Sequence, residues 1–168
     1  SNAFWVEVEN QRKTGQKMSS MIDKLIQLKK NKMEFRGKLL IPMVVYVENS
    51  KDERGYAINH KERVISAVKS ISKNDLALKF VKLKMTGLKI DGFEEENTII
   101  ESDSISIELK SLERIGTKEI DGITMYPVRG IPCGINKKTL TVIRGNESIK
   151  FESMTQAKRY IAMLSVSS

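Results

Sequence analysis

The sequence predicts an α/β fold, in which a mixed sheet flanked by helices is followed by a smaller β-rich part that ends in a helix. Three observations predict it. In the first half, extended apolar segments alternate with segments whose apolar residues recur at three- and four-residue steps. In the second half, short β-like segments are separated by glycine-containing turns. Apolar residues make up 40% of the 168 residues, which is enough for a hydrophobic core.

The first half is expected to run strand, helix, strand, helix, strand. Residues 4–9 predict a strand, and residues 16–30 have a helical apolar period that Thr14 is expected to cap. Residues 39–47 form a continuous apolar run, which is typical of a strand buried on both faces. Because proline has no N–H to donate, Pro42 is expected near the entry of this strand or at a bulge.

The second helix is expected to begin after Asn59, because Glu62 follows it in a capping-box position. Residues 76–85 predict the third strand. Its alternation slips between Phe80 and Val81, which indicates a bulge at that point. The alternating order of strands and helices predicts parallel strands joined by right-handed crossovers.

The second half is expected to be mainly β, after a glycine- and acid-rich connection at residues 86–98. Gly145 and Asn146 predict a tight hairpin turn, and Ser153 with Gln156 predicts the start of a final helix. The predicted strands are residues 99–109, 123–128, 140–144 and 148–151.

Three parts are expected along the chain. Residues 1–3, Ser-Asn-Ala, resemble the remnant left after tag removal. Residues 4–97 are expected to form the α/β domain, and residues 98–168 the β-rich segment with its C-terminal hairpin and helix. Because the native segment then begins abruptly inside an apolar run, we expect this chain to be a fragment of a longer protein.

Cysteine and histidine are too few for several kinds of site. The single cysteine, Cys133, excludes an internal disulfide and a multi-cysteine zinc site, and the single histidine, His60, excludes a histidine-rich metal centre. Cys133 is expected to be a small turn residue, and His60 a surface residue in the first turn of a helix. No apolar stretch approaches the roughly 20 residues needed to span a bilayer, and a cytoplasmic setting is expected.

The chain is basic, since 29 Lys and Arg residues against 21 Asp and Glu residues give a net charge of +8. Such a balance favours polyanions, so DNA is the expected partner; the alternative is an ordinary lysine-rich surface. Aromatic residues are only 6%, which does not favour a platform for stacking single-stranded bases. The residues expected to contact phosphates are Lys24, Lys29, Lys30, Arg144, Lys150, Lys158 and Arg159.

Glu7 and Glu9 are the candidate catalytic and metal-binding residues. On a strand they share one face with Trp5, and their side chains are about 7 Å apart. Two carboxylates with this spacing can hold Mg²⁺ or Mn²⁺ together with a phosphate oxygen, and Lys13 is a candidate for orienting the attacking water or neutralising charge on the phosphate. The alternative is that the two glutamates are solvated or paired with lysines.

The Val6-Glu7-Val8-Glu9 strand, the helix that follows and the apolar strand at residues 39–47 together resemble the second half of the PD-(D/E)XK nuclease-like core. The closest likeness is to the nuclease-like domains of replication-relaxation and mobilisation proteins of plasmids and integrative elements. The resemblance covers residues 4–85 and implies that Glu7 takes the family's acidic position and Glu9 the position usually held by lysine. In the family, the first acid comes from a strand that would precede Phe4. The resemblance therefore implies a domain truncated at its N-terminal side, and leaves catalysis by this fragment open.

The C-terminal hairpin and helix, with residues 149–153 and 157–161, resemble small modules appended to phage and mobile-element nucleases. Two functions are therefore expected as alternatives. The first is a DNA-binding or DNA-processing protein of a mobile genetic element, built on a metal-dependent nuclease-like fold. The second is a non-catalytic interaction or DNA-binding domain in which the acidic residues are structural.

Overall fold

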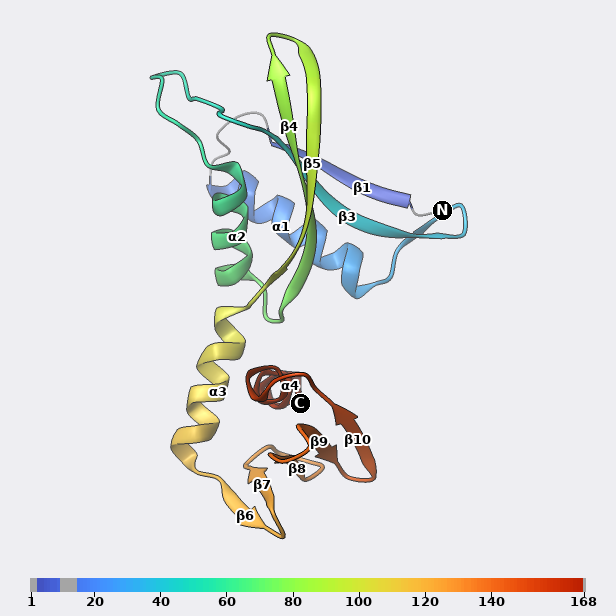
Figure 1. Ribbon diagram of the computed structural model, residues 1–168, viewed down its shortest axis with the longest axis vertical. Helices are drawn as coiled ribbons and strands as arrows, with labels where there is room; N and C mark the ends of the chain where they lie inside the picture. The colour runs from blue at the N-terminus through green and yellow to red at the C-terminus, as the bar shows by residue number, and fades with distance from the viewer. Residues whose placement is uncertain (1–2, 10–14, 168) are drawn as a thin grey trace. The chain divides into compact units, whose positions relative to one another are not determined.

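The computed structural model describes residues 3–9 and 15–167 of the chain (Figure 1). The chain divides into two compact units, Ser1–Ser102 and Asp103–Ser168, and each has its own hydrophobic core. The sequence places the boundary between residues 97 and 98, whereas the structure places it just after the last strand of the first unit ends. The two units are described separately below as unit 1 and unit 2.

Unit 1 consists of a mixed sheet and two helices. Its sheet has the order β1-β3-β4-β5, with the short β2 antiparallel to the start of β3. β1, β3 and β4 run parallel, and β5 returns antiparallel to β4. The elements are β1 (Ala3–Glu9), α1 (Gly15–Lys30), β2 (Glu34–Phe35), β3 (Lys38–Val47), α2 (His60–Ile71), β4 (Leu76–Thr86) and β5 (Lys89–Ile100).

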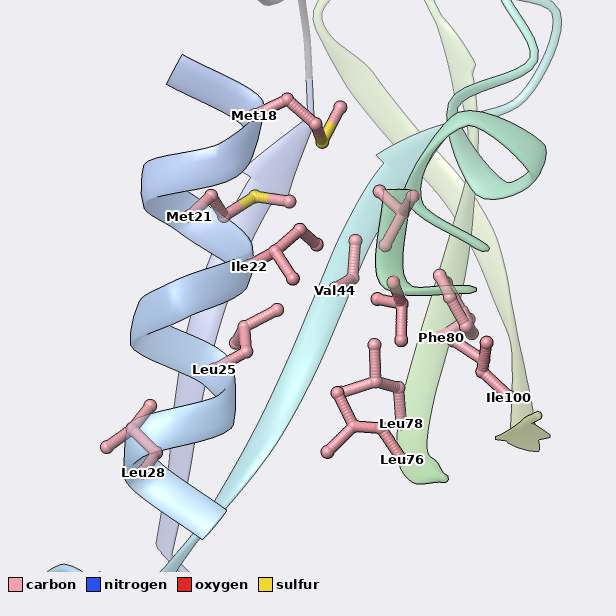
Figure 2. Close-up of a cluster of buried hydrophobic side chains, with 12 residues drawn as sticks. Met18, Met21, Ile22, Leu25, Leu28, Val44, Leu76, Leu78, Phe80 and Ile100 are labelled. Carbon is pink, nitrogen blue, oxygen red and sulfur yellow. The ribbon is translucent and has the colours of Figure 1, made fainter. Parts of the chain in front are cut away.

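Both helices of unit 1 pack against the same face of its sheet. Val44 of β3 and Phe80 of β4 are register partners on that face, and both are buried. Each large apolar side chain buried there stabilises the fold by roughly 1.5–3 kcal/mol. Figure 2 shows the side chains of α1 pointing towards the strands, where the labelled core residues are Met18, Met21, Ile22, Leu25, Leu28, Val44, Leu76, Leu78, Phe80 and Ile100.

The opposite face of this sheet has no helix of unit 1 over it. Phe4, Val6 and Val8 of β1 alternate with the helix-facing residues and are 39%, 46% and 54% exposed. In β3 only Pro42 and Val44 are buried, and the other residues are partly or fully exposed. The prediction that residues 39–47 are buried on both faces is therefore wrong, because the two crossover helices lie on one side of the sheet.

β4 and β5 form a long hairpin (Figure 1). The prediction of an irregular connection at residues 86–98 is wrong, because this segment is the return strand β5. The turn is tight, and Gly87 within it has a φ of +58°, a conformation that glycine adopts without strain. The strand was not predicted because β5 is rich in acidic residues, which are uncommon in strands unless cations on the neighbouring strand face them.

The β-bulge in this hairpin lies between Lys84 and Met85 rather than between Phe80 and Val81. Phe80 and Val81 are both buried although they point to opposite faces of the sheet. Regular strand geometry therefore explains the two consecutive apolar residues without an inserted one.

Two local expectations rest on single residues of unit 1. The Glu62 N–H donates to the Asn59 side chain at 3.2 Å, which confirms Asn59 as the N-cap of α2. Pro42 pairs with Trp5 of β1 and precedes Met43, where the pairing of β3 with β4 begins, so its missing N–H removes no bond to β4. Thr14 lies outside the described residues.

Unit 2 is an antiparallel sheet of order β10-β9-β8-β7-β6, packed with two helices. The prediction of a strand over residues 99–109 is wrong, because the chain leaves β5 at Ile100 and enters a helix at Asp103. An acidic residue in the first turn of a helix interacts favourably with the macrodipole. The elements are α3 (Asp103–Ile115), β6 (Lys118–Ile120), β7 (Ile123–Tyr126), β8 (Cys133–Asn136), β9 (Thr141–Arg144), β10 (Glu147–Lys150) and α4 (Met154–Ser167).

The C-terminal part of unit 2 agrees closely with the prediction. Arg144 and Glu147 pair across the two-residue turn, so the hairpin is confirmed. The Gln156 N–H donates to the Ser153 hydroxyl at 3.2 Å, which confirms the start of α4. The core between the sheet and the helices is built from Ile105, Leu112, Tyr126, Cys133, Ile135, Val142, Ala157, Ile161 and Ala162.

Candidate functional site

The structure places Glu7 and Glu9 on the helix-covered face of the unit 1 sheet. Their register partners on β3 are Val44 and Tyr46. Glu7 is partly exposed, and its carboxylate accepts a hydrogen bond of 2.9 Å from the Trp5 indole N–H. Glu9 is the last residue of β1 and its side chain is fully buried. The two acids therefore share a face, as predicted, but they have different surroundings.

His60 lies beside Glu9 in the interior. Its Nδ1 is 4.0 Å from the Glu9 carboxylate, and both side chains are 0% exposed. The prediction that His60 is a surface residue is wrong. His60 is buried because it lies on the core-facing side of α2, which it shares with Val64 and Val68 at steps of four residues. That spacing is the signal by which the sequence could have placed His60 in the core.

The described residues do not test the predicted metal site fully. They contain no group of three or more His, Cys, Asp or Glu side chains arranged to hold an ion. Glu7 accepts a hydrogen bond from Trp5, and the buried Glu9 carboxylate lies 4.0 Å from His60 Nδ1. Lys13 lies outside the described residues. Binding of Mg²⁺ or Mn²⁺ by Glu7 and Glu9 stays a prediction, and no catalytic step is derived from it.

The basic residues of α1 form a surface cluster that continues into the turn after α1 and the turn after β2. Lys29 donates to the Ala77 carbonyl at 3.5 Å, and partial burial lowers the pKa of its ammonium group. Across residues 3–9 and 15–167, no described ion pair connects this cluster to a carboxylate. The cluster, called the α1 cluster below, consists of Lys24, Lys29, Lys30, Lys32 and Arg36, all of which are exposed.

A cleft of about 600 Å³ opens beside the α1 cluster, where β3 and β4 are not yet paired. Lys29 and Lys32 of the α1 cluster line it, whereas Lys79, which also lines it, is paired with Glu95. Its other walls are largely apolar, and none of its lining residues is acidic. The cleft therefore extends the positive surface of the α1 cluster inward from the helix.

The lysines of β4 are neutralised, in contrast to the α1 cluster. Lys79 pairs with Glu95 at 2.9 Å, and Lys84 pairs with Glu94 at 2.8 Å. Lys82 contacts Glu94 at 3.1 Å and also Glu48. Antiparallel pairing aligns the acidic stretch of β5 with the basic stretch of β4, so the two opposite charge runs in the sequence largely cancel.

These ion pairs predict an acid-dependent loss of stability. Hydrogen bonds from Lys84 and Lys82 lower the pKa of Glu94 below its ordinary value of 4.5. The unfolded chain therefore binds a proton more readily than the native one, so the contribution of Glu94 is present above pH 4.5 and is lost as the pH falls through the lowered pKa. We expect urea unfolding between pH 3 and 5 to vary less with pH in Glu94→Gln than in the wild type. The same slope in both proteins would contradict this.

The predicted phosphate contacts of unit 2 divide into two groups. Lys150 is exposed and Arg144 is partly exposed. Lys158 pairs with Glu113 of α3 at 3.1 Å, and this hydrogen bond raises the pKa of Lys158. Arg159 is only 9% exposed and donates to the Ser106 hydroxyl at 2.9 Å. Lys158 and Arg159 thus connect α4 to α3, and the phosphate contact of Arg159 stays a prediction.

The thiol of Cys133 is not suited to act as a nucleophile. It begins strand β8 rather than occupying a turn, and it is 1% exposed. Its thiol donates to the Ile131 carbonyl at 3.2 Å, and burial raises its pKa. A buried thiol with a raised pKa stays protonated and inert.

Comparison of the chain with protein-family models, with curated proteins and with solved structures found no match. Among the described residues, no helix is both long and apolar enough to cross a membrane. The PD-(D/E)XK likeness therefore stays a prediction.

Proposed function

We propose that this protein binds DNA through the phosphate backbone and that the α1 cluster is its main contact. The observation that carries the proposal is the contrast between the two basic stretches of unit 1. The lysines of β4 are paired with carboxylates, whereas the α1 cluster is exposed and has no described ion pair. Unopposed cations are the ones that gain most from replacing the counterions of DNA.

Further support comes from the grouping of these cations along one continuous segment. Lys29 and Lys30 occupy the last turn of α1, Lys32 lies in the turn that follows, and Arg36 lies in the turn after β2. Cations at a helix C-terminus also stabilise the helix through its macrodipole, so a purely structural role is the alternative. The two roles differ in the effect of salt, because only phosphate contacts make DNA affinity fall linearly with the logarithm of salt concentration.

The proposed role of Glu9 and His60 is structural. Both side chains are fully buried beside one another, which fits packing at the end of β1 better than contact with a nucleic acid. Of the two functions expected from the sequence, the burial of Glu9 and His60 favours a non-catalytic binding domain over a nuclease. The origin from a mobile genetic element stays a prediction.

The test compares two triple variants that change net charge equally. Lys24→Gln, Lys30→Gln and Arg36→Gln together are expected to lower affinity for a duplex DNA by roughly 100-fold at 0.1 M salt, and to reduce the salt slope by about three. Fluorescence anisotropy over a salt series measures both quantities. The matched control carries Lys61→Gln, Lys82→Gln and Lys84→Gln, three lysines that are paired with carboxylates and do not line the cleft, and it is expected to bind nearly as well as the wild type.

Two outcomes would overturn the proposal. Equal weakening in both triple variants would mean that overall charge, and not the α1 cluster, governs binding. A wild-type chain that does not bind DNA even at low salt would remove the function altogether. Circular dichroism of each variant separates loss of binding from loss of fold.

A further inference from the structure

One edge of the unit 1 sheet is left open. β1 pairs with β3 on one side, and no described strand pairs with its other side. The strand also presents apolar side chains to solvent, since Phe4, Trp5, Val6 and Val8 are all at least 39% exposed. An edge strand of this kind is a template for pairing with another extended chain.

The opposite edge of the same sheet is protected. β5 has three consecutive acidic residues at positions 94–96, and the β-bulge at Lys84 and Met85 interrupts the regular pairing of its hairpin. Charges and bulges are the usual devices that prevent edge-to-edge association. The described residues of β1 contain neither a lysine, nor a proline, nor a bulge. The contrast points to β1 as the edge that accepts a partner.

The sequence of β1 is complementary to itself when it is read in the antiparallel direction. Centring the pairing on Val6 places Val6 opposite Val6 of a second copy. Phe4 then lies opposite Val8, and Trp5 lies opposite Glu7. Apolar residues thus meet apolar residues, and the Trp5 ring, whose indole N–H donates to Glu7 of its own strand, lies beside Glu7 of the second copy. No two like charges are directly opposite each other, which is the arrangement that stabilises antiparallel pairs.

We propose that the chain forms a two-fold symmetric dimer in which β1 pairs antiparallel with β1 of a second copy, in the register centred on Val6. The two unit 1 sheets become one continuous sheet across the axis. The exposed apolar residues Phe4, Val6 and Val8 then adjoin their counterparts, and each buries part of its surface against its cross-strand neighbour. The interface is isologous, as expected for a closed dimer, and it does not depend on DNA binding.

The test uses single cysteines on the full chain to read out the register. Val6→Cys brings two copies of residue 6 directly opposite each other, at a Cα separation of about 4.5–5.5 Å, which a disulfide can bridge. Val8→Cys is the matched control, because residue 8 pairs with residue 4 and its two copies are about 13 Å apart along the strands. The native Cys133 does not interfere, since it is 1% exposed.

Under mild oxidation with copper phenanthroline, Val6→Cys is expected to give a covalent dimer at least tenfold faster than Val8→Cys. Light scattering of the unmodified chain at about 100 μM is expected to give twice the chain mass. Cross-linking of both variants at the same rate would overturn the proposed register, and a monomer at that concentration would overturn the dimer.

A second pair of variants separates edge pairing from stacking of the open sheet faces. Val6→Lys places a charge on β1 and is expected to shift the chain to a monomer. Phe93→Lys places the same charge on β5, where residue 93 is 62% exposed, and is expected to leave the dimer intact. Loss of the dimer in both variants would show face-to-face association instead, and so would overturn pairing through β1.

Discussion

Replacing Glu9 by alanine is expected to lower the free energy of unfolding of unit 1 by about 3–5 kcal/mol. Glu9 and His60 are both fully buried, with 4.0 Å between the carboxylate and Nδ1. Removing one member of such a pair leaves the other in the interior without the group it faced, and it also leaves a cavity at the end of β1. An effect of this size is a large fraction of the stability of a small domain.

The measurement is urea unfolding followed by the fluorescence of Trp5, which is the only tryptophan of the chain and lies in β1. Glu7→Ala is the matched control, because Glu7 is on the same strand and face but is partly exposed. Its loss removes one hydrogen bond from Trp5, and the expected change is about 1 kcal/mol or less. A smaller effect for Glu9→Ala than for Glu7→Ala would contradict the structural role of the buried pair.

The same variant bears on the proposed function. If Glu9 is structural, Glu9→Ala binds DNA like the wild type at a temperature at which both are folded. Under the metal-binding hypothesis, Mn²⁺ would instead raise the melting temperature of the wild type and not that of the variant. Thermal unfolding with and without Mn²⁺ therefore distinguishes the two roles of this carboxylate.

Replacing Gly134 by valine is expected to unfold unit 2 partly or wholly at 37 °C. A Cβ atom at this position would lie 2.6 Å from Ile123 Cγ2 and from Met125 Sδ, and 3.0 Å from the Thr124 carbonyl oxygen. β7 and β8 are neighbours in register here, so the Ile123 and Met125 side chains must move, and the Thr124 carbonyl must give way slightly, to make room. Overpacking of this kind costs roughly 1–3 kcal/mol or more, and a unit this small has little stability to lose.

Hydrogen exchange measured on peptides from β8 and β9 reports this effect separately from unit 1. The control is Gly92→Val in β5, where a Cβ meets nothing within 4 Å and φ is not in the left-handed region. Valine is a better strand former than glycine, so that variant is expected to be neutral or slightly stabilising. Equal loss of protection in unit 2 from both substitutions would rule out the steric explanation.

Local signals in the sequence were sufficient for several elements. The apolar period of α1, the Asn59 cap with Glu62, and the turn at Gly145 and Asn146 were all predicted and are confirmed. Each of these depends on residues within a few positions of one another, where propensity and hydrogen-bonding chemistry act directly. The strand at β1, with Glu7 and Glu9 on one face, was predicted on the same basis.

Prediction failed where the deciding partner is distant in sequence. β5 was missed because its glutamates are strand-compatible only when they face the lysines of β4. The spacing of His60, Val64 and Val68 could have placed His60 in the core, but the residue that it faces there, Glu9, is distant in sequence. The burial of Arg159 was missed for a similar reason, since its hydrogen-bond partner, Ser106, lies on another helix, and its phosphate contact stays a prediction.

The sequence by itself determined the α/β class, most of the helices and strands, and the positive net charge. Only the tertiary structure decided which cations remain unpaired, which acid is buried, and which strand edge is left open. The physical reason is that periodicity and capping act between neighbours along the chain. Charge neutralisation, burial and strand pairing depend instead on contacts between residues far apart in sequence.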